Sequence, residues 1–289
     1  MRNLVFIAIF FIFLACTANS VSDTNEFKNY TITKVCDLPE EVIETSGILF
    51  LDGVLWTFND SGNDPILYGI DTSAGEVVKS FEIATAENID WEAITEDHQN
   101  IYIADVGNNG NSRDTYEIYV LSKDSLTKQS TKKIHPSKVI RFEYSETGLE
   151  DINLNAVDVD CEAILSKEDS LVLLTKDWFY YSVAAFTCSK TASHSTGELQ
   201  GSFELGFAAT AAVRMDENHL AILGYKDYRS YLVILDSDPT LRHAKEVARF
   251  ELYDLEGFQT EGLCYADGKF YISSESLSMP QALFRMEFH

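Results

Sequence analysis

The sequence is poor in basic residues and has none of the compositional extremes of a non-globular chain. Lysine and arginine total 22 against 46 aspartates and glutamates, so the 289 residues carry a formal net charge of −24. A surface this acidic repels nucleic acid and anionic membranes, which argues against a nucleic-acid partner. With 45% hydrophobic and 12% aromatic residues, the composition excludes a disordered, collagen-like or coiled-coil chain. The carboxylate excess instead favours binding of divalent cations or cationic surfaces.

Several catalytic and metal-binding signatures are missing as well. The six histidines form no HExxH or HxH pair and the cysteine spacing fits no zinc pattern, so zinc chemistry is not expected. The chain also contains no GxSxG elbow and no cysteine close to a histidine in sequence. No segment sustains a 3.6-residue apolar period. Short apolar or alternating runs separated by Gly, Asn, Asp and Ser predict an all-β fold.

The N-terminus resembles a bacterial export signal. An apolar run over residues 4–14 follows Arg2 and is too short for a stable membrane span, so residues 1–15 are predicted to be a signal peptide. The segment Phe13-Leu14-Ala15-Cys16 resembles a lipobox, which predicts diacylation of Cys16 and a polar tether over residues 16–29. We therefore expect a lipoprotein that is anchored to a bacterial membrane, with the outer membrane as the expected location, and that faces the periplasm or the cell surface. An ordinary cleaved signal is the alternative.

Four further cysteines would lie in an oxidising compartment after export. They are Cys36, Cys161, Cys188 and Cys264. Four cysteines allow three disulfide pairings, and the sequence does not choose among them.

An internal repeat predicts the architecture. Residues 44–48, 90–94 and 160–164 resemble one another, with weaker copies at 209–213 and 259–263. Each copy precedes a turn and a second strand that ends 13 or 14 residues after the third motif residue. A third strand follows in all five units and a fourth in four of them, which is typical of β-propeller blades.

The fifth unit lacks its fourth strand, and residues 30–38 form an unassigned strand ahead of the first unit. Pairing of these two ends would close the ring and cover the open edge. We therefore expect one domain over residues 30–289, a propeller of five four-stranded blades. Six blades is the alternative, because the second unit is about 70 residues long where the others are about 50.

The repeat carries acidic side chains toward the expected channel. Residues two apart on a strand face the same side, so Asp90 should point with Glu92, and Asp160 with Glu162, while Trp91 packs between blades. Crowded carboxylates need protons, a cation such as Lys176 or a metal, and hard oxygen ligands from several blades suit calcium. Acids that only solvate a wet channel are the alternative. The candidate calcium ligands are Asp60, Asp90, Glu92, Asp105, Asp160, Glu162, Glu261 and Glu275.

Residues 259–275 (QTEGLCYADGKFYISSE) resemble a recurring segment of β-propeller phytases and of the related SdiA-regulated family. The starts of the acidic strands at 90–93 and 160–163 resemble the same family. This resemblance implies a propeller with calcium on channel carboxylates, and Asp90, Glu92, Asp160, Glu162 and Glu261 as ligands.

Two functions remain open from the sequence. The first is a tethered module that binds a protein, glycan or small molecule at the propeller face. The second is a calcium-dependent hydrolase of a phosphoester or lactone, in which Glu92, Glu162 or Glu261 is the general base. In that case Lys176 or Arg113 would stabilise the anionic substrate.

Overall fold

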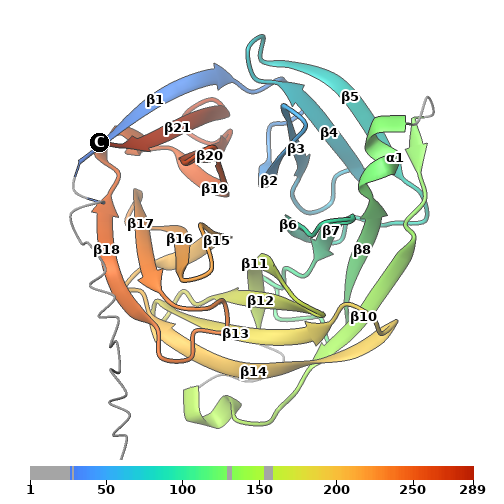
Figure 1. The fold of residues 1–289 in the computed structure, drawn as a ribbon, viewed down its shortest axis with the longest axis vertical. Coiled ribbons are helices and arrows are strands. Elements are labelled where there is room, and N and C mark those ends of the chain that lie inside the picture. Colours follow the sequence, from blue (N-terminus) through green and yellow to red (C-terminus); the bar gives the residue numbers. More distant parts are fainter. Residues whose placement is uncertain (1–26, 28, 129–131, 153–158) are drawn as a thin grey trace, which may run out of the picture.

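A computed structural model describes residue 27 and residues 29–128, 132–152 and 159–289. Almost all regular structure in these residues is β-strand, arranged as a ring of sheets around a central axis (Figure 1). The all-β prediction is therefore confirmed. The predicted signal peptide, Cys16 and all but two residues of the predicted tether lie outside the described residues. Among the described residues, no helix is long and apolar enough to cross a membrane.

The strands form five successive groups along the chain, each an antiparallel meander. The first comprises β2 (Thr45–Leu51), β3 (Val54–Asn59), β4 (Ile66–Asp71) and β5 (Glu76–Ile83). The second comprises β6 (Trp91–Glu96), β7 (Asn100–Asp105), β8 (Tyr116–Ser122) and β10 (Lys138–Tyr144). The third comprises β11 (Asp160–Lys167), β12 (Ser170–Lys176), β13 (Ser182–Ser189) and β14 (His194–Glu204). The fourth comprises β15 (Ala208–Arg214), β16 (His219–Lys226), β17 (Arg229–Asp236) and β18 (Lys245–Glu251).

The last group joins the two ends of the chain. It contains β19 (Gln259–Ala266), β20 (Lys269–Glu275) and β21 (Ala282–Phe288), followed in the sheet by β1 (Tyr30–Asp37). β1 runs antiparallel to β21, with Tyr30 opposite Phe288 and Asp37 opposite Ala282. The N-terminal strand therefore closes the ring as expected, and the edge of β21 is covered.

The first strand of every group lies innermost. β2, β6, β11, β15 and β19 each contact the next in a closed circuit that surrounds the axis (Figure 1). The outer strands are less separate, because β10 pairs in parallel with β14 and merges the second and third groups into one eight-stranded sheet. Hydrogen bonding therefore yields four sheets, and this count does not match five separate four-stranded sheets.

The extra length of the second unit contains short elements of its own. Residues 123–128 form the short helix α1 (Lys123–Lys128), and β9 (Lys133–Ile134) adds a parallel fifth strand to β5. Two 3-10 turns, η1 (Leu149–Ile152) and η3 (Tyr253–Leu255), complete the described elements.

Apolar side chains fill the spaces between neighbouring groups. Trp91 is fully buried and packs edge-on against Phe58 of the preceding group at a ring distance of 5.4 Å, as expected for a residue between blades. Burial of rings of this size is the main stabilising term of such an interface. The four described cysteines are all free thiols, so the structure contains none of the three possible pairings.

Candidate metal and ligand site at the channel mouth

A β-bulge at the repeat motif directs acidic side chains to the axis. Pairing of β6 with β7 skips a residue between Trp91 and Ala93, and pairing of β11 with β12 skips one between Cys161 and Ala163. The same shift occurs between Thr260 and Gly262 in β19. The skipped residues are Glu92, Glu162 and Glu261. A bulge leaves its extra residue unpaired and re-aims the side chain, so the bulge places these glutamates in the channel.

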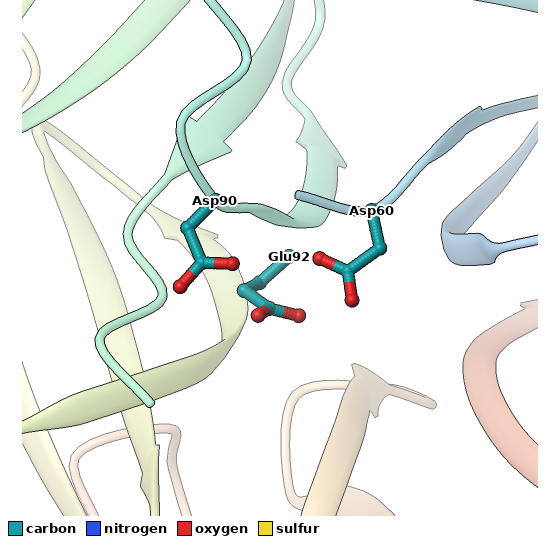
Figure 2. Close-up of side chains that lie close together, drawn as sticks. All are labelled: Asp60, Asp90 and Glu92. Carbon is teal, nitrogen blue, oxygen red and sulfur yellow. The ribbon is translucent and has the colours of Figure 1, made fainter. Parts of the chain in front are cut away.

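Three carboxylates converge at one side of the mouth. Asp60 follows β3, Asp90 precedes β6, and Glu92 is the bulged residue of β6. One oxygen from each lies within 4.8 Å of the others, and Figure 2 shows the three groups pointing toward one another. We call these residues the acidic triad. Of the eight candidate metal ligands, these three come together.

Gly107 forms the floor of the acidic triad. The amides of Val106 and Gly107 both donate to the Asp90 carbonyl at 3.1 Å, which brings the loop against the carboxylates. A Cβ on Gly107 would lie 2.5 Å from Asp90 Oδ2 and 2.5 Å from Glu92 Oε1. Only glycine leaves this space free. Three hard oxygen donors around a cradle of this kind could hold a metal ion.

Asp105 holds Asp90 of the triad in place through its main chain. It is fully buried, accepts the Asp90 amide at 3.0 Å through Oδ1, and pairs with Arg113 at 2.7 Å. Arg113 also donates to the Gly107 carbonyl at 2.9 Å. Arg113 is thus bound within the protein, and its contacts hold the glycine loop in place.

Two buried carboxylate oxygens near the mouth have no hydrogen-bond partner among the described residues. They are Asp105 Oδ2 and Asp160 Oδ2. Asp160 uses its other oxygen to accept the Asn108 amide at 2.7 Å. Unpartnered buried oxygens are uncommon and call for an explanation such as an ion or ordered water.

The remaining acids are arranged around Lys176 and Gln259. Lys176 pairs with Glu162, and both side chains are almost fully buried. Gln259 donates to Glu261 at 3.0 Å and also to Glu275. Glu162, Glu261 and Glu275 therefore have partners from the protein, and they lie outside the triad.

The crowding changes the ionisation of these groups. Burial, and then repulsion from Asp60 and Asp160, raises the pKa of Asp90 to about 6. Burial raises the pKa of Glu261 to about 7, and burial together with Glu261 raises that of Glu275 to about 8. Burial alone would lower the pKa of Lys176, but the surrounding carboxylates raise it well above its usual value. The carboxyls at this mouth therefore retain protons to a higher pH than exposed carboxyls do.

A cavity of about 190 Å³ connects these groups. Its wall contains residues from all five strand groups, of which sequence reasoning identified the acids and Lys176. Five other lining residues and Gly107 were not among the predicted site residues. Tyr225 carried a signal, because it stands at the second-strand end where the other units have Asp60, Asp105, Lys176 and Glu275. The five lining residues are Ser46, Asn109, Trp178, Tyr225 and Gln259.

Comparison with known proteins supports the fold only. No family model matches the chain, and no curated protein matches it in sequence. The chain is similar to the PQQ-bound aldose sugar dehydrogenase of Streptomyces coelicolor, with a TM-score of 0.54 and 8% identity over 90% of this chain and 99% of that one. This likeness indicates a β-propeller-like fold. The specific resemblance to phytases and the SdiA-regulated family gains no support.

Two further solved structures are more distant. The exo-β-1,3-galactanase of Phanerochaete chrysosporium matches at a TM-score of 0.47 and 13% identity, over 71% of this chain and 49% of that chain. The WD40 domain of Toxoplasma gondii coronin matches at 0.43 and 11% identity, over 91% and 87%.

Proposed function

We infer that this chain is a five-bladed β-propeller that binds calcium at the acidic triad and a ligand in the cavity beside it. The observation that carries this inference is the convergence of Asp60, Asp90 and Glu92 above Gly107. A divalent cation there would compensate most of the triad's charge and hold one wall of the cavity rigid.

The count of five blades rests on the inner strands. Five first strands complete the circuit around the axis, and each begins its own four-stranded meander. The parallel pairing of β10 with β14 is then an edge contact between two blades. The extra residues of the second unit contribute α1, β9 and η1, so the described part of this unit offers no additional meander for a sixth blade.

Binding is favoured over hydrolysis by the state of the two basic residues. Lys176 is paired with Glu162, and Arg113 with Asp105. The charge of each basic residue is therefore neutralised by a carboxylate of the protein. A phosphoesterase would need these charges to bind the anionic substrate. A non-catalytic module is consistent with this arrangement.

A calcium-dependent hydrolase is the second candidate, and one observation favours it. The pKa of Glu261 is raised to about 7 inside the cavity, which suits a general base at neutral pH. The calcium would polarise the substrate. A panel of phosphoesters and lactones, assayed with and without calcium, tests this candidate. Calcium-dependent turnover that Glu261→Gln abolishes in a folded protein would establish the hydrolase and displace the binding module.

Export and lipidation of Cys16 remain part of the proposal, and the fold gives them an orientation. β20 ends at the acidic mouth with Glu275, and Ser274 pairs with Ala282 at the start of β21. Tyr30 lies opposite Phe288, at the far end of β21. The tether would therefore leave from the face opposite the mouth, and the mouth would face away from the membrane. Cys16→Ser should abolish labelling by radioactive palmitate and release the protein from the membrane fraction.

Calcium binding is tested by calorimetry and thermal melting on chelator-stripped protein. We expect heat and a rise in melting temperature on adding calcium, both lost in Asp90→Asn. Asp52→Asn, at an exposed residue in the turn between β2 and β3, at the opposite end of β3 from Asp60, is the matched control and should behave as the unchanged protein. Absence of heat and of a melting shift in the unchanged protein would remove the calcium site.

A further inference from the structure

An aromatic groove adjoins the acidic cavity. It has a volume of about 330 Å³, and Trp178, Tyr225 and Gln259 line both the groove and the cavity. Tyr181 and Tyr228 line the groove alone. The two hollows thus form one continuous site with an aromatic part and a carboxylate part.

The rings of the groove are presented to solvent at a conformational cost. The side chain of Tyr228 is 83% exposed, and that of Trp178 is 44% exposed. Tyr228 is the second residue of the two-residue turn between β16 and β17 and has a φ of 65°. Glycine is the favoured residue at that position. A tyrosine at this position carries backbone strain that is not offset by burial of its ring.

The charges beside the groove are unevenly compensated. Lys176 is matched by Glu162, and a calcium ion would match most of the acidic triad. Glu261 and Glu275 both accept hydrogen bonds from Gln259, a neutral side chain, and the cavity wall has five carboxyl groups against the single ammonium group of Lys176. Gln259 also lines the groove, so this pair of glutamates stands at its inner end.

Ammonium groups already lie over aromatic rings in this region. Lys226 Nζ is 4.1 Å from the centre of the Tyr181 ring, and Lys176 Nζ is 5.1 Å from that of Trp178. The first lies within the groove, which Lys226 and Tyr181 both line. Faces of these rings therefore accept a cation, as expected from their quadrupole.

We propose that this combined site binds an organic cation, an ammonium group carried on an apolar or aromatic body. The ammonium lies at the Glu261–Glu275 pair, and the body lies in the groove against Tyr225, Trp178 and Tyr228. This proposal rests on the ligand-binding function proposed above and names its ligand class. Charge complementarity selects the cation, because an ammonium group would stabilise the ionised form of the two glutamates against the cost of their burial, and a neutral molecule would not.

The protein supplies its own reporter. Trp56 and Trp91 are buried and Trp178 is the exposed tryptophan of the three, so a change in the exposed component of the tryptophan emission reports on the groove. We would titrate the calcium-loaded protein with 2-phenylethylamine and, in parallel, with 2-phenylethanol, which has the same body without the charge. Saturable binding of the amine at least about tenfold tighter than the alcohol is expected.

Variants separate the two parts of the site. Glu275→Gln should reduce the preference for the amine to less than about threefold. Tyr228→Gly should weaken amine and alcohol alike, and its exposed position protects the fold. Phe179→Ala, at a neighbouring ring that is 89% exposed and outside the groove lining, is the matched control and should change neither affinity.

Three results would overturn the proposal. They are equal affinity for amine and alcohol, absence of saturable binding, and tighter binding of a neutral sugar such as methyl β-glucoside. Failure of the proposed calcium site can be distinguished from failure of this proposal, because calorimetry with calcium on the unchanged protein and on Asp90→Asn measures calcium binding separately. Amine selectivity that persists in a protein without calcium binding would leave this inference standing and remove only the metal.

Discussion

Lys176 is the buried cation of the channel, and its removal tests whether the surrounding acids depend on it. Its side chain is 6% exposed and pairs with that of Glu162, which is 2% exposed. Glu261 and Glu92 also act on it electrostatically. Lys176→Met keeps most of the apolar stem and removes the charge, so the carboxylates lose their internal counter-ion.

The expected cost follows from the burial of the pair. Removing one partner of a buried ion pair costs about 3–5 kcal/mol. For a domain of this length, about 1 kcal/mol corresponds to about 2–4 °C in melting temperature, so we expect a loss of about 6–20 °C at pH 8. The loss should be smaller at pH 5. Burial already raises the pKa of Glu162 and of Glu92, so in the variant these carboxyls take up protons and avoid the unpaired charge.

Thermal unfolding followed by circular dichroism at pH 5 and pH 8, in chelator, measures this effect. Lys176→Met combined with Glu162→Gln should recover most of the lost stability, because the orphaned carboxylate is neutralised. Lys34→Met is the control, since Lys34 pairs with Asp37 in an exposed position and such pairs contribute at most about 1 kcal/mol. A loss equal at the two pH values, or unrelieved by Glu162→Gln, would refute the reasoning.

The site supports three further predictions. In chelator, the free energy of unfolding should fall as pH rises from about 4.5 to about 8. Burial raises the pKa of Glu261 to about 7 and that of Glu275 to about 8. Over this range the native state therefore holds more protons than the unfolded chain. Melting temperatures that climb over this range would contradict it, whereas stabilisation by added calcium should grow with pH because the metal needs charged ligands. Gly107→Ala should abolish the calcium-induced melting shift in a folded protein, because its Cβ displaces the triad carboxylates. Gly110→Ala in the same loop, where the nearest atom is 3.5 Å away, should retain the shift. Tyr228→Gly should leave stability unchanged or raise it by up to about 1 kcal/mol in denaturant unfolding, because glycine adopts a positive φ without strain, and a clear loss would show that the ring packs against the protein.

The sequence repeat predicted the inner strands because the repeated motif coincides with a β-bulge in these strands. Asp-Trp-Glu-Ala and Asp-Cys-Glu-Ala recur where a β-bulge must re-aim a side chain, so the motif and the bulge coincide. Strict alternation was nevertheless the wrong reason for the direction of these glutamates. Pairing skips Glu92 and Glu162, and it is the bulge that turns them to the axis.

The division of the acids among the acidic triad, Lys176 and Gln259 could not be predicted from their spacing in the sequence. Asp60, Asp105, Lys176 and Glu275 hold equivalent positions at second-strand ends, yet each has a different partner. Asp105 is buried against Arg113 because the loop after β7 folds back and donates Arg113 Nη1 to it. The pairing of Arg113 with Asp105 depends on the path of one loop, and the repeat does not determine that path.

The fourth unit explains why the aromatic groove and the acidic triad lie on different sides of one mouth. Its motif is Ala209-Thr210-Ala211, so the bulged residue is Thr210, which donates to the Thr260 carbonyl at 2.9 Å and brings no charge to the axis. Its second strand reaches the mouth with Tyr225, an aromatic residue where the other units have an acid or lysine. The ring of charge is therefore open on one side, and the aromatic groove lies there, built largely on the β16–β17 turn. A perfectly regular repeat would surround the axis with equal charge and favour an ion alone, whereas the divergent unit gives the mouth an apolar side and makes room for a larger ligand.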